Sequence, residues 1–303
     1  MSVLFNISSK IILEGDSTED LNYVFNDLNT DVVAAYGFRR LSPDYYGALI
    51  RVRNKNPNGD DTEKDFYPNA DGKIDIDELK SYVKTPNRPA FLISFYNQAA
   101  NPKSYTNPTA GDGNATAPTN QTEPRIVNAQ VVNRTNGLIS APLIFNGNED
   151  YLKVNSSSDN QITGNMFAYF VGSHDGTSGN NAMFSKSGEY ELVYTTSENV
   201  QYSDSTGSVD LPVSASSDLR IHSFNRNKAA NTIDLQVNET SSTNSINTNP
   251  ISGTTEDLYI GAKANGVSNF LGDFQELVIF NSYKDATDKA DILNKVKKYY
   301  NAY

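Results

Sequence analysis

The sequence predicts an all-β fold, a jelly-roll β-sandwich with short peripheral helices. The first observation is composition: 303 residues include 18 tyrosines and 14 phenylalanines, with abundant Asn, Ser and Thr, which suits short strands joined by polar loops. The second is rhythm, because short apolar segments recur about every ten residues with turn residues between them. The chain is long enough to bury one large core. We therefore predict a single domain over residues 31–303, preceded by an extension over residues 1–30.

The first half of the predicted domain supplies strands with an unusual number of arginines. Residues 31–40 and 89–98 are largely apolar, and Arg51 alternates with Ile50 and Val52 as in a half-buried strand. Four arginines lie among these apolar residues: Arg39, Arg40, Arg51 and Arg53. Charges near a core need partners. We expect them to pair with the surplus acids, and binding of a phosphate or carboxylate is the alternative.

The second half predicts the main run of strands and a closing helix. The expected strands are residues 166–171, 189–195, 219–224, 233–239, 258–262 and 274–280, with a polar loop over residues 240–255. Residues 285–299 show helical periodicity. We expect Ala290, Ile292, Leu293 and Val296 to face the sheet.

Residues 67–78 resemble a calcium loop. With Gly72 at the sixth position, Asn69, Asp71, Asp75 and Glu78 fall at positions three, five, nine and twelve of the EF-hand pattern. The first ligand position, however, is a tyrosine followed by proline, and no helix is predicted before it. We predict a turn that caps a helix over residues 75–84. Calcium is the alternative, and no other cofactor is expected.

Charge and composition exclude several classes of function. The net charge of -11 opposes binding to nucleic acid, which requires Lys and Arg to neutralise phosphates. The absence of cysteine excludes disulfides and thiolate metal sites. No apolar run approaches the roughly 20 residues that cross a bilayer. The first residues do not form a convincing signal peptide, so we expect synthesis in a cytoplasm and no membrane insertion.

Five segments in fixed order over residues 31–152 carry a resemblance to a known family. They read AAYGFRRLSPDYYGALIRVRNKN, DFYPNADGKIDIDELKSYV, PAFLISFYNQ, EPRIVN and APLIFNGNEDYL. This order resembles the catalytic module of the arabinofuranosidase B family of glycosidases, and the lectin-like modules of the same pattern in tailed-phage virion proteins. The resemblance implies a concanavalin A-like, laminin G-like sandwich.

The residues that depart from this family argue against catalysis. Where many relatives have Trp-Tyr-Asp-Gln, this chain has Phe95, Tyr96, Asn97 and Gln98, and Asn97 cannot act as an acid, base or nucleophile. The family's adjacent cysteine pair and its Asp-Tyr-Gly-Asn segment are missing. Other acids are Asp175, Glu189, Glu191, Asp273 and Glu276, but spacing brings no two of them together as glycoside hydrolysis requires. His174 and His222 are too few for a three-histidine metal site, and we expect His222 to be a satisfied core or edge histidine. We predict no catalytic residue.

Three functions follow from the resemblance. The first is a non-enzymatic virion structural protein on a phage particle, as a capsid decoration or a tail or fibre component, made in the host cytoplasm. Residues 1–30, with apolar runs at 3–5 and 11–13, would then dock to other virion proteins, and a homo-oligomer is a further option. The alternatives are an adhesin for host surface glycans and an arabinofuranosidase-like hydrolase. For a glycan we name Tyr96, Asn97, Gln98 and Tyr105, in and before a low-complexity loop at residues 99–122.

Overall fold

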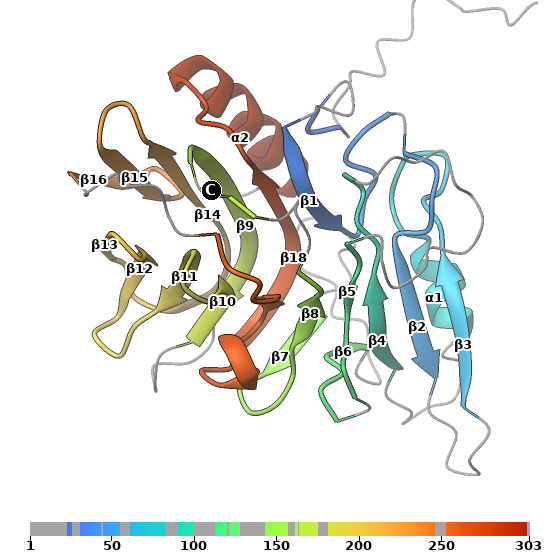
Figure 1. Cartoon of the computed structure of the whole chain (residues 1–303). Coiled ribbons are helices and arrows are strands. Elements are labelled where there is room, and N and C mark those ends of the chain that lie inside the picture. The colour runs from blue at the N-terminus through green and yellow to red at the C-terminus, as the bar shows by residue number, and fades with distance from the viewer. Residues whose placement is uncertain are drawn as a thin grey trace, which may run out of the picture.

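A computed structural model shows two antiparallel sheets packed as a sandwich, with two α-helices on its outside (Figure 1). This arrangement confirms the predicted fold class. The structure describes residues 23–25, 31–43, 45–54, 61–82, 90–99, 113–119, 121–127, 143–156, 161–162, 164–174, 181–245 and 253–301. None of the helices in these ranges is long and apolar enough to cross a membrane.

The first sheet is built around two long neighbouring strands, β9 (Met166–His174) and β18 (Leu271–Phe280). Beside β9 lie β14 (Ser216–Asn227), β15 (Thr232–Val237) and β16 (Thr240–Ser245), and beside β18 lies β1 (Val32–Gly37). The start of β18 also pairs with β7 (Leu143–Asn146). All of these pairings are antiparallel, which is what a jelly-roll connectivity requires.

The second sheet runs along the other layer of the sandwich. Its strands in spatial order are β13 (Gly207–Pro212), β12 (Asn199–Asp204), β11 (Tyr190–Tyr194), β10 (Asn181–Lys186), β17 (Leu258–Ile260), β8 (Leu152–Val154), β5 (Ala115–Thr116), β4 (Ala90–Phe95), β2 (Ile50–Asn54) and β3 (Thr62–Phe66). A short strand, β6 (Arg125–Val127), pairs with both β4 and β7. It therefore joins the two sheets along one side.

Strand β9 is buried on both faces and divides the apolar residues into two clusters. Met166, Ala168 and Phe170 enter the main core between the sheets. Phe167 and Tyr169 point the other way, into a second cluster beneath helix α2 (Ala286–Tyr300). Figure 1 shows α2 lying across the outer side of this sheet. The strand is central because side chains alternate between faces and both faces are covered.

Helix α2 begins and ends at recognisable caps. Asp285 accepts hydrogen bonds from the backbone N–H groups of Thr287 and Asp288, and Asn301 adopts the left-handed conformation at the other end. Ile292, Leu293 and Val296 are buried as expected. The expectation for Ala290 was wrong: it is exposed, because its position on the helix turns it away from the sheet.

Several elements differ from the sequence prediction in extent. Residues 240–245, predicted as loop, form the exposed strand β16, whose polar sequence carries no alternation. Part of the predicted loop at 99–122 forms β5. Helix α1 is described over Ile76–Tyr82, and residues 83–84 of the predicted helix lie outside the described residues. A short 3-10 turn, η2 (Ala264–Gly266), precedes β18. The two strands that were missed, β16 and β5, are specified by pairing rather than by an apolar pattern.

Part of the predicted N-terminal extension packs into the domain. Val24 and Phe25 are 2% and 6% exposed and belong to the cluster beneath α2. Their backbone N–H groups both donate to the carbonyl oxygen of Leu41, at 2.9 and 3.3 Å. The apolar runs at residues 3–5 and 11–13 lie outside the described residues. Residues 23–25 are therefore part of the sandwich itself.

Candidate functional site

The outer face of β2, β3 and β4 collects aromatic and charged side chains. Ile50 and Val52 point into the core, so Arg51 points outward. The register places Asp65 of β3 and Ser94 of β4 on either side of Arg51. Tyr67 and Tyr96 come two residues after those partners and project on the same side. We call Arg51, Asp65, Tyr67 and Tyr96 the tyrosine face; Tyr45, which is 5% exposed and belongs to the main core cluster, lies close enough to act electrostatically with Tyr67 and Asp65.

A rigid arginine–carboxylate pair lies at the centre of the tyrosine face. Arg51 Nε and Nη2 donate to Asp65 Oδ1 and Oδ2, each at 2.7 Å, and the Tyr96 hydroxyl donates to Asp65 Oδ1 at 2.6 Å. These two hydrogen bonds fix the plane of the Arg51 guanidinium relative to the plane of the Asp65 carboxylate. The Arg51 and Asp65 side chains remain 32% and 21% exposed, and the Tyr67 residue is 52% exposed. The pair and one aromatic ring are therefore accessible from outside.

The protonation states of the tyrosine face are set by these contacts. Burial by itself raises the pKa of Asp65, but the hydrogen bonds from Arg51 and Tyr96 outweigh it and hold the pKa below its usual 3.8. Burial and the bond to Asp65 raise the pKa of Tyr96. Burial, together with Tyr67 and Asp65, raises that of Tyr45. At neutral pH Arg51 and Asp65 are therefore both charged, and the Tyr96 phenol is protonated.

The predicted glycan residues are distributed unevenly. Tyr96 belongs to the tyrosine face. The Asn97 amide accepts from the backbone of Ala35 at 2.9 Å and of Ala99 at 3.0 Å. The Gln98 amide accepts from Leu41 at 2.9 Å and donates to the Arg39 carbonyl oxygen at 2.9 Å. These two buried amides hold β1 and the following turn against the end of β4 (Asn97 8% and Gln98 0% exposed). Their geometry gives no support to a role in binding glycan, and Tyr105 lies outside the described residues.

The calcium-like segment forms a turn followed by α1. Asn69 Oδ1 accepts from the backbone N–H groups of Asp71 and Lys73, both at 3.0 Å. Asp75 Oδ1 accepts from the backbone of Glu78 at 2.9 Å and caps α1, while the Glu78 carboxylate pairs with Lys64 at 2.9 Å. Within the described residues no group of three potential metal ligands comes together here or elsewhere. The contacts match the predicted helix-capping turn.

The predicted pairing of arginines with acids is confirmed for three of the four. Arg39 pairs with Glu276 at 2.7 Å, Arg51 pairs with Asp65, and Arg53 pairs with Glu123. Arg40 instead lies over the rings of Tyr23 and Tyr46, at 4.9 and 5.3 Å from their centroids. The contacts of Arg39 and Arg40 hold the turn after β1 against the sandwich.

The acids considered for catalysis are also engaged. Glu189 pairs with Lys186 at 3.5 Å and Glu191 with Lys263 at 3.0 Å. Glu276 is fully buried with Arg39. Asp273 is 8% exposed on β18, and Asp175 lies outside the described residues. Glu189, Glu191 and Glu276 are therefore each held by a cation.

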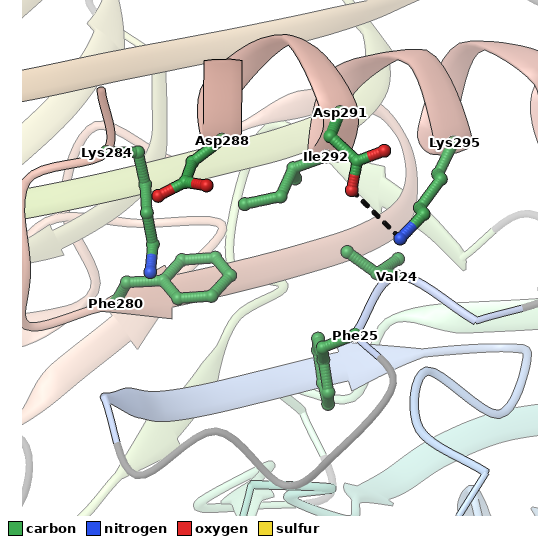
Figure 2. Close-up of a pocket in the computed structure, with 8 residues that line it drawn as sticks. All are labelled: Val24, Phe25, Phe280, Lys284, Asp288, Asp291, Ile292 and Lys295. Atoms are coloured by element: carbon green, nitrogen blue, oxygen red, sulfur yellow. Dashed lines mark ion pairs between the residues drawn. The ribbon is translucent and has the colours of Figure 1, made fainter. Parts of the chain in front are cut away.

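A cleft of about 210 Å³ lies between α2, the end of β18 and residues 24–25. Figure 2 shows its apolar side chains and its charged rim; the lining residues are Val24, Phe25, Phe280, Lys284, Asp288, Asp291, Ile292 and Lys295. Two rim charges, Asp291 and Lys295, pair with each other at 2.9 Å, and Lys284 donates to Asp31 at 2.5 Å. The cleft offers no exposed aromatic ring. The tyrosine face is the stronger candidate site.

Only part of this face could be predicted from the sequence. Tyr96 follows a predicted buried strand and was expected at a glycan site, while Arg51 was expected to pair with an acid, with phosphate or carboxylate binding as the alternative. Asp65 and Tyr67 were missed as site residues because β3 was not predicted: its sequence, TEKDF, shows no apolar alternation. Their alignment with Arg51 depends on strand register, which appears only in the structure.

Comparison with known proteins identifies the fold. No family model matches the sequence, and no curated protein matches it. Among solved structures, a GH54 α-L-arabinofuranosidase soaked with a cyclic sulfate inhibitor superposes with a TM-score of 0.65 and 13% identity, over 88% of this chain and 63% of that one. An arabinofuranosidase complexed with arabinofuranosyl-alpha-1,2-xylobiose gives 0.64 and 13%, over 88% and 62%. The chain thus spans less than two-thirds of the length of these enzymes, and at this identity the likeness establishes the β-sandwich fold alone.

Proposed function

We propose that this protein is a non-enzymatic β-sandwich that binds carbohydrate on the tyrosine face. The observation that carries the proposal is the partly exposed Arg51–Asp65 pair beside the Tyr67 ring. A sugar presents an apolar C–H face, which stacks on an aromatic ring, and hydroxyl groups that both donate and accept hydrogen bonds. Asp65 supplies acceptors and Arg51 supplies donors within reach of the same ligand.

The pair is organised before any ligand arrives. Arg51 and Tyr96 fix the Asp65 carboxylate with three hydrogen bonds of 2.6 to 2.7 Å. A site that is already ordered loses less conformational entropy on binding. The names of the solved neighbours, two arabinofuranosidases of which one holds arabinofuranosyl-alpha-1,2-xylobiose, support a carbohydrate ligand and suggest an arabinose-decorated xylo-oligosaccharide as the first probe.

The environments of Asp65 and Glu276 support binding of a carbohydrate without its hydrolysis. Glycoside hydrolysis needs two opposed carboxyl groups, one of which has a raised pKa. On the tyrosine face the pKa of Asp65 is lowered, which is the wrong direction for a general acid. Glu276 is sealed in the core with Arg39. Arabinofuranosidase-like hydrolysis is therefore the competing proposal that the experiment below must exclude.

The finer proposal is a structural protein exposed on a phage particle, where glycan binding would help attachment to the host. It is supported by the sequence resemblance to virion modules. A truncation that removes residues 1–22 tests it, because Val24 and Phe25 pack in the domain and must stay. We expect the truncated protein to fold and to lose attachment to particles. Attachment that survives the truncation would contradict docking through this segment.

The glycan proposal is tested by titrating a panel of neutral oligosaccharides, including the arabinose-decorated probe, into wild type and Tyr67→Ala. We expect roughly tenfold weaker binding in the variant, because the stacking platform is removed. Tyr283→Ala is the matched control, since Tyr283 is 39% exposed and lies outside the face. Equal binding by wild type and Tyr67→Ala would contradict the site, and release of arabinose would contradict the non-enzymatic assignment. Repeating the titration with a chelator tests the calcium alternative.

A further inference from the structure

Both histidines of the chain lie together at one end of the sandwich. His174 is the last residue of β9, Tyr194 is the last residue of β11, and their rings stack at 4.0 Å between centroids with an angle of 17°. The Tyr194 hydroxyl lies 2.9 Å from His222 Nε2 on β14. Arg220 is two residues before His222 and belongs to the same group. We call His174, Tyr194, Arg220 and His222 the histidine cluster.

The histidine cluster contains buried polar atoms that bond to nothing in the described structure. His174 is 3% exposed and both of its ring nitrogens lack a hydrogen-bond partner among the described residues. His222 is 1% exposed, and its ring is held by the Tyr194 hydroxyl and by the backbone of Phe170, its partner on β9. Buried polar groups are normally hydrogen-bonded, because an unpaired one costs its full desolvation penalty. Two such nitrogens on the ring of His174 indicate a ligand that supplies the missing partners.

The positive charge of Arg220 in the histidine cluster also points to a ligand from outside. Arg220 is half-buried, and its Nη1 donates to the carbonyl oxygen of Ser214 at 2.5 Å. Among the described residues no carboxylate forms an ion pair with it, although the chain has 36 acids against 25 Lys and Arg. An arginine that is held near a core without an acid, in an acidic protein, is suited to an anion from outside.

The imidazoles are neutral and can serve hydroxyl groups. Burial, and then the positive charge of Arg220, lower the pKa of His174 to about 4 and that of His222 to about 3. A neutral imidazole has one donor and one acceptor nitrogen. Hydroxyl groups can satisfy both, while a second cation would be repelled by Arg220. The cluster therefore combines one anion-binding group with partners for hydroxyls.

We propose that the histidine cluster is a second binding site, which takes a carboxylate-bearing sugar with its carboxylate on Arg220 and its hydroxyls on the imidazole of His174. The site differs in ligand class from the tyrosine face, whose arginine is already neutralised by Asp65 and suits a neutral sugar. His174 is 3% exposed, so a ligand must displace side chains that cover it. Arg220 is restrained by its bond to the carbonyl oxygen of Ser214 and by a side-chain hydrogen bond with Tyr194.

The two imidazoles give a direct reporter, because the chain has no other histidine. Long-range proton–nitrogen NMR spectra of full-length protein are recorded during titration with methyl glucuronide, methyl glucoside and acetate. We expect both imidazole signals to move with the glucuronide, since neutralising Arg220 removes a charge that acts on both rings. The glucoside, which lacks only the carboxylate, should move them little.

Arg220→Gln separates this site from the tyrosine face. We expect glucuronide affinity to fall roughly 10- to 100-fold, as for a lost charge-assisted hydrogen bond, with the neutral-glycan affinity unchanged. Tyr67→Ala should show the opposite pattern, so each site can fail without the other. Unmoved imidazole signals, or an equal response to the glucoside, would overturn the proposal. Acetate that binds as tightly as the glucuronide would overturn recognition of the sugar.

Discussion

Two arginine–carboxylate pairs of nearly equal geometry lie in very different surroundings. Arg39 binds Glu276 through Nε at 2.7 Å and Nη2 at 3.0 Å, and the hydroxyls of Tyr169 and Tyr300 donate to the same carboxylate at 2.7 and 2.8 Å. Arg51 binds Asp65 twice at 2.7 Å, with one tyrosine donor. The side chains of the first pair are 1% and 0% exposed, and those of the second 32% and 21%.

The difference in burial assigns the two pairs different roles. The ring of Tyr299 covers Arg39, with its centroid 3.9 Å from the guanidinium carbon, and Tyr300 reaches Glu276 from the end of α2. The first pair therefore fastens α2 and β1 to β18. The second pair has no such cover and keeps donors and acceptors facing outward. The same chemical motif stabilises the fold in one place and offers a binding surface in the other.

The largest effect is expected from the buried pair. Glu276→Gln leaves Arg39 charged in the core without its counterion, and we expect the free energy of unfolding to fall by about 3–5 kcal/mol. Urea denaturation followed by circular dichroism measures it. The double variant Arg39→Met, Glu276→Leu should recover much of the loss because no charge is left unpaired. If Glu276→Gln lost less than about 1 kcal/mol of unfolding free energy, the structural role assigned to the buried pair would be contradicted.

The histidine cluster sharpens the comparison, because its two imidazoles are buried and no carboxylate among the described residues forms an ion pair with it. The pKa values of His174 and His222 are about 4 and about 3, below the usual 6.5. The unfolded chain therefore binds more protons below pH 6.5, and stability falls as pH decreases from 6.5 toward 4, by up to about 1 kcal/mol per pH unit for each histidine. Denaturation at pH 7 and pH 5 measures this. The variant His174→Gln, His222→Gln should show a flatter profile, and an unchanged slope would contradict the assignment.

The exposed pair should affect binding more than stability. Asp65→Asn removes the charge that Arg51 pairs with, but Arg51 reaches solvent, so we expect less than about 1 kcal/mol loss of unfolding free energy. The affinity for a neutral glycan should fall roughly tenfold, because a charged acceptor is lost. Titration and denaturation of the same sample provide both values. A variant that loses stability but keeps its affinity would reverse the assigned roles.

The smallest effect on affinity is expected from the tyrosine that orients Asp65. Tyr96→Phe removes one hydrogen bond while keeping the ring, so stability should fall by about 1 kcal/mol. Glycan affinity should fall by a factor of about two to three, since Arg51 still holds the carboxylate. Calorimetric titration resolves this difference. An affinity loss as large as that of Asp65→Asn would show that Tyr96 contacts the sugar itself.

The sequence predicted the fold where local patterns are strong. Residues 166–171 lie within β9, and residues 285–299 nearly match α2, because burial on both faces and helical periodicity leave a clear pattern. β16 was missed because its residues are polar and exposed, and only pairing with β15 makes it a strand.

The candidate site was less predictable for the same reason. Arg51, Asp65 and Tyr96 are brought together by the register of three strands that are separated by loops in the chain. Asn97 and Gln98 looked like ligands for a sugar, yet backbone groups of β1 and its following turn take their hydrogen bonds. Whether an amide serves the fold or a ligand depends on which backbone groups lie beside it, and the sequence does not specify that.

The most direct test of the two roles is a crystal structure of the protein with the tightest-binding neutral oligosaccharide of the panel. The account predicts a sugar ring stacked on Tyr67, with hydroxyls hydrogen-bonded to Asp65 and Arg51, and an unchanged Arg39–Glu276 pair. A sugar bound elsewhere, such as in the cleft beneath α2, with the tyrosine face empty, would contradict it.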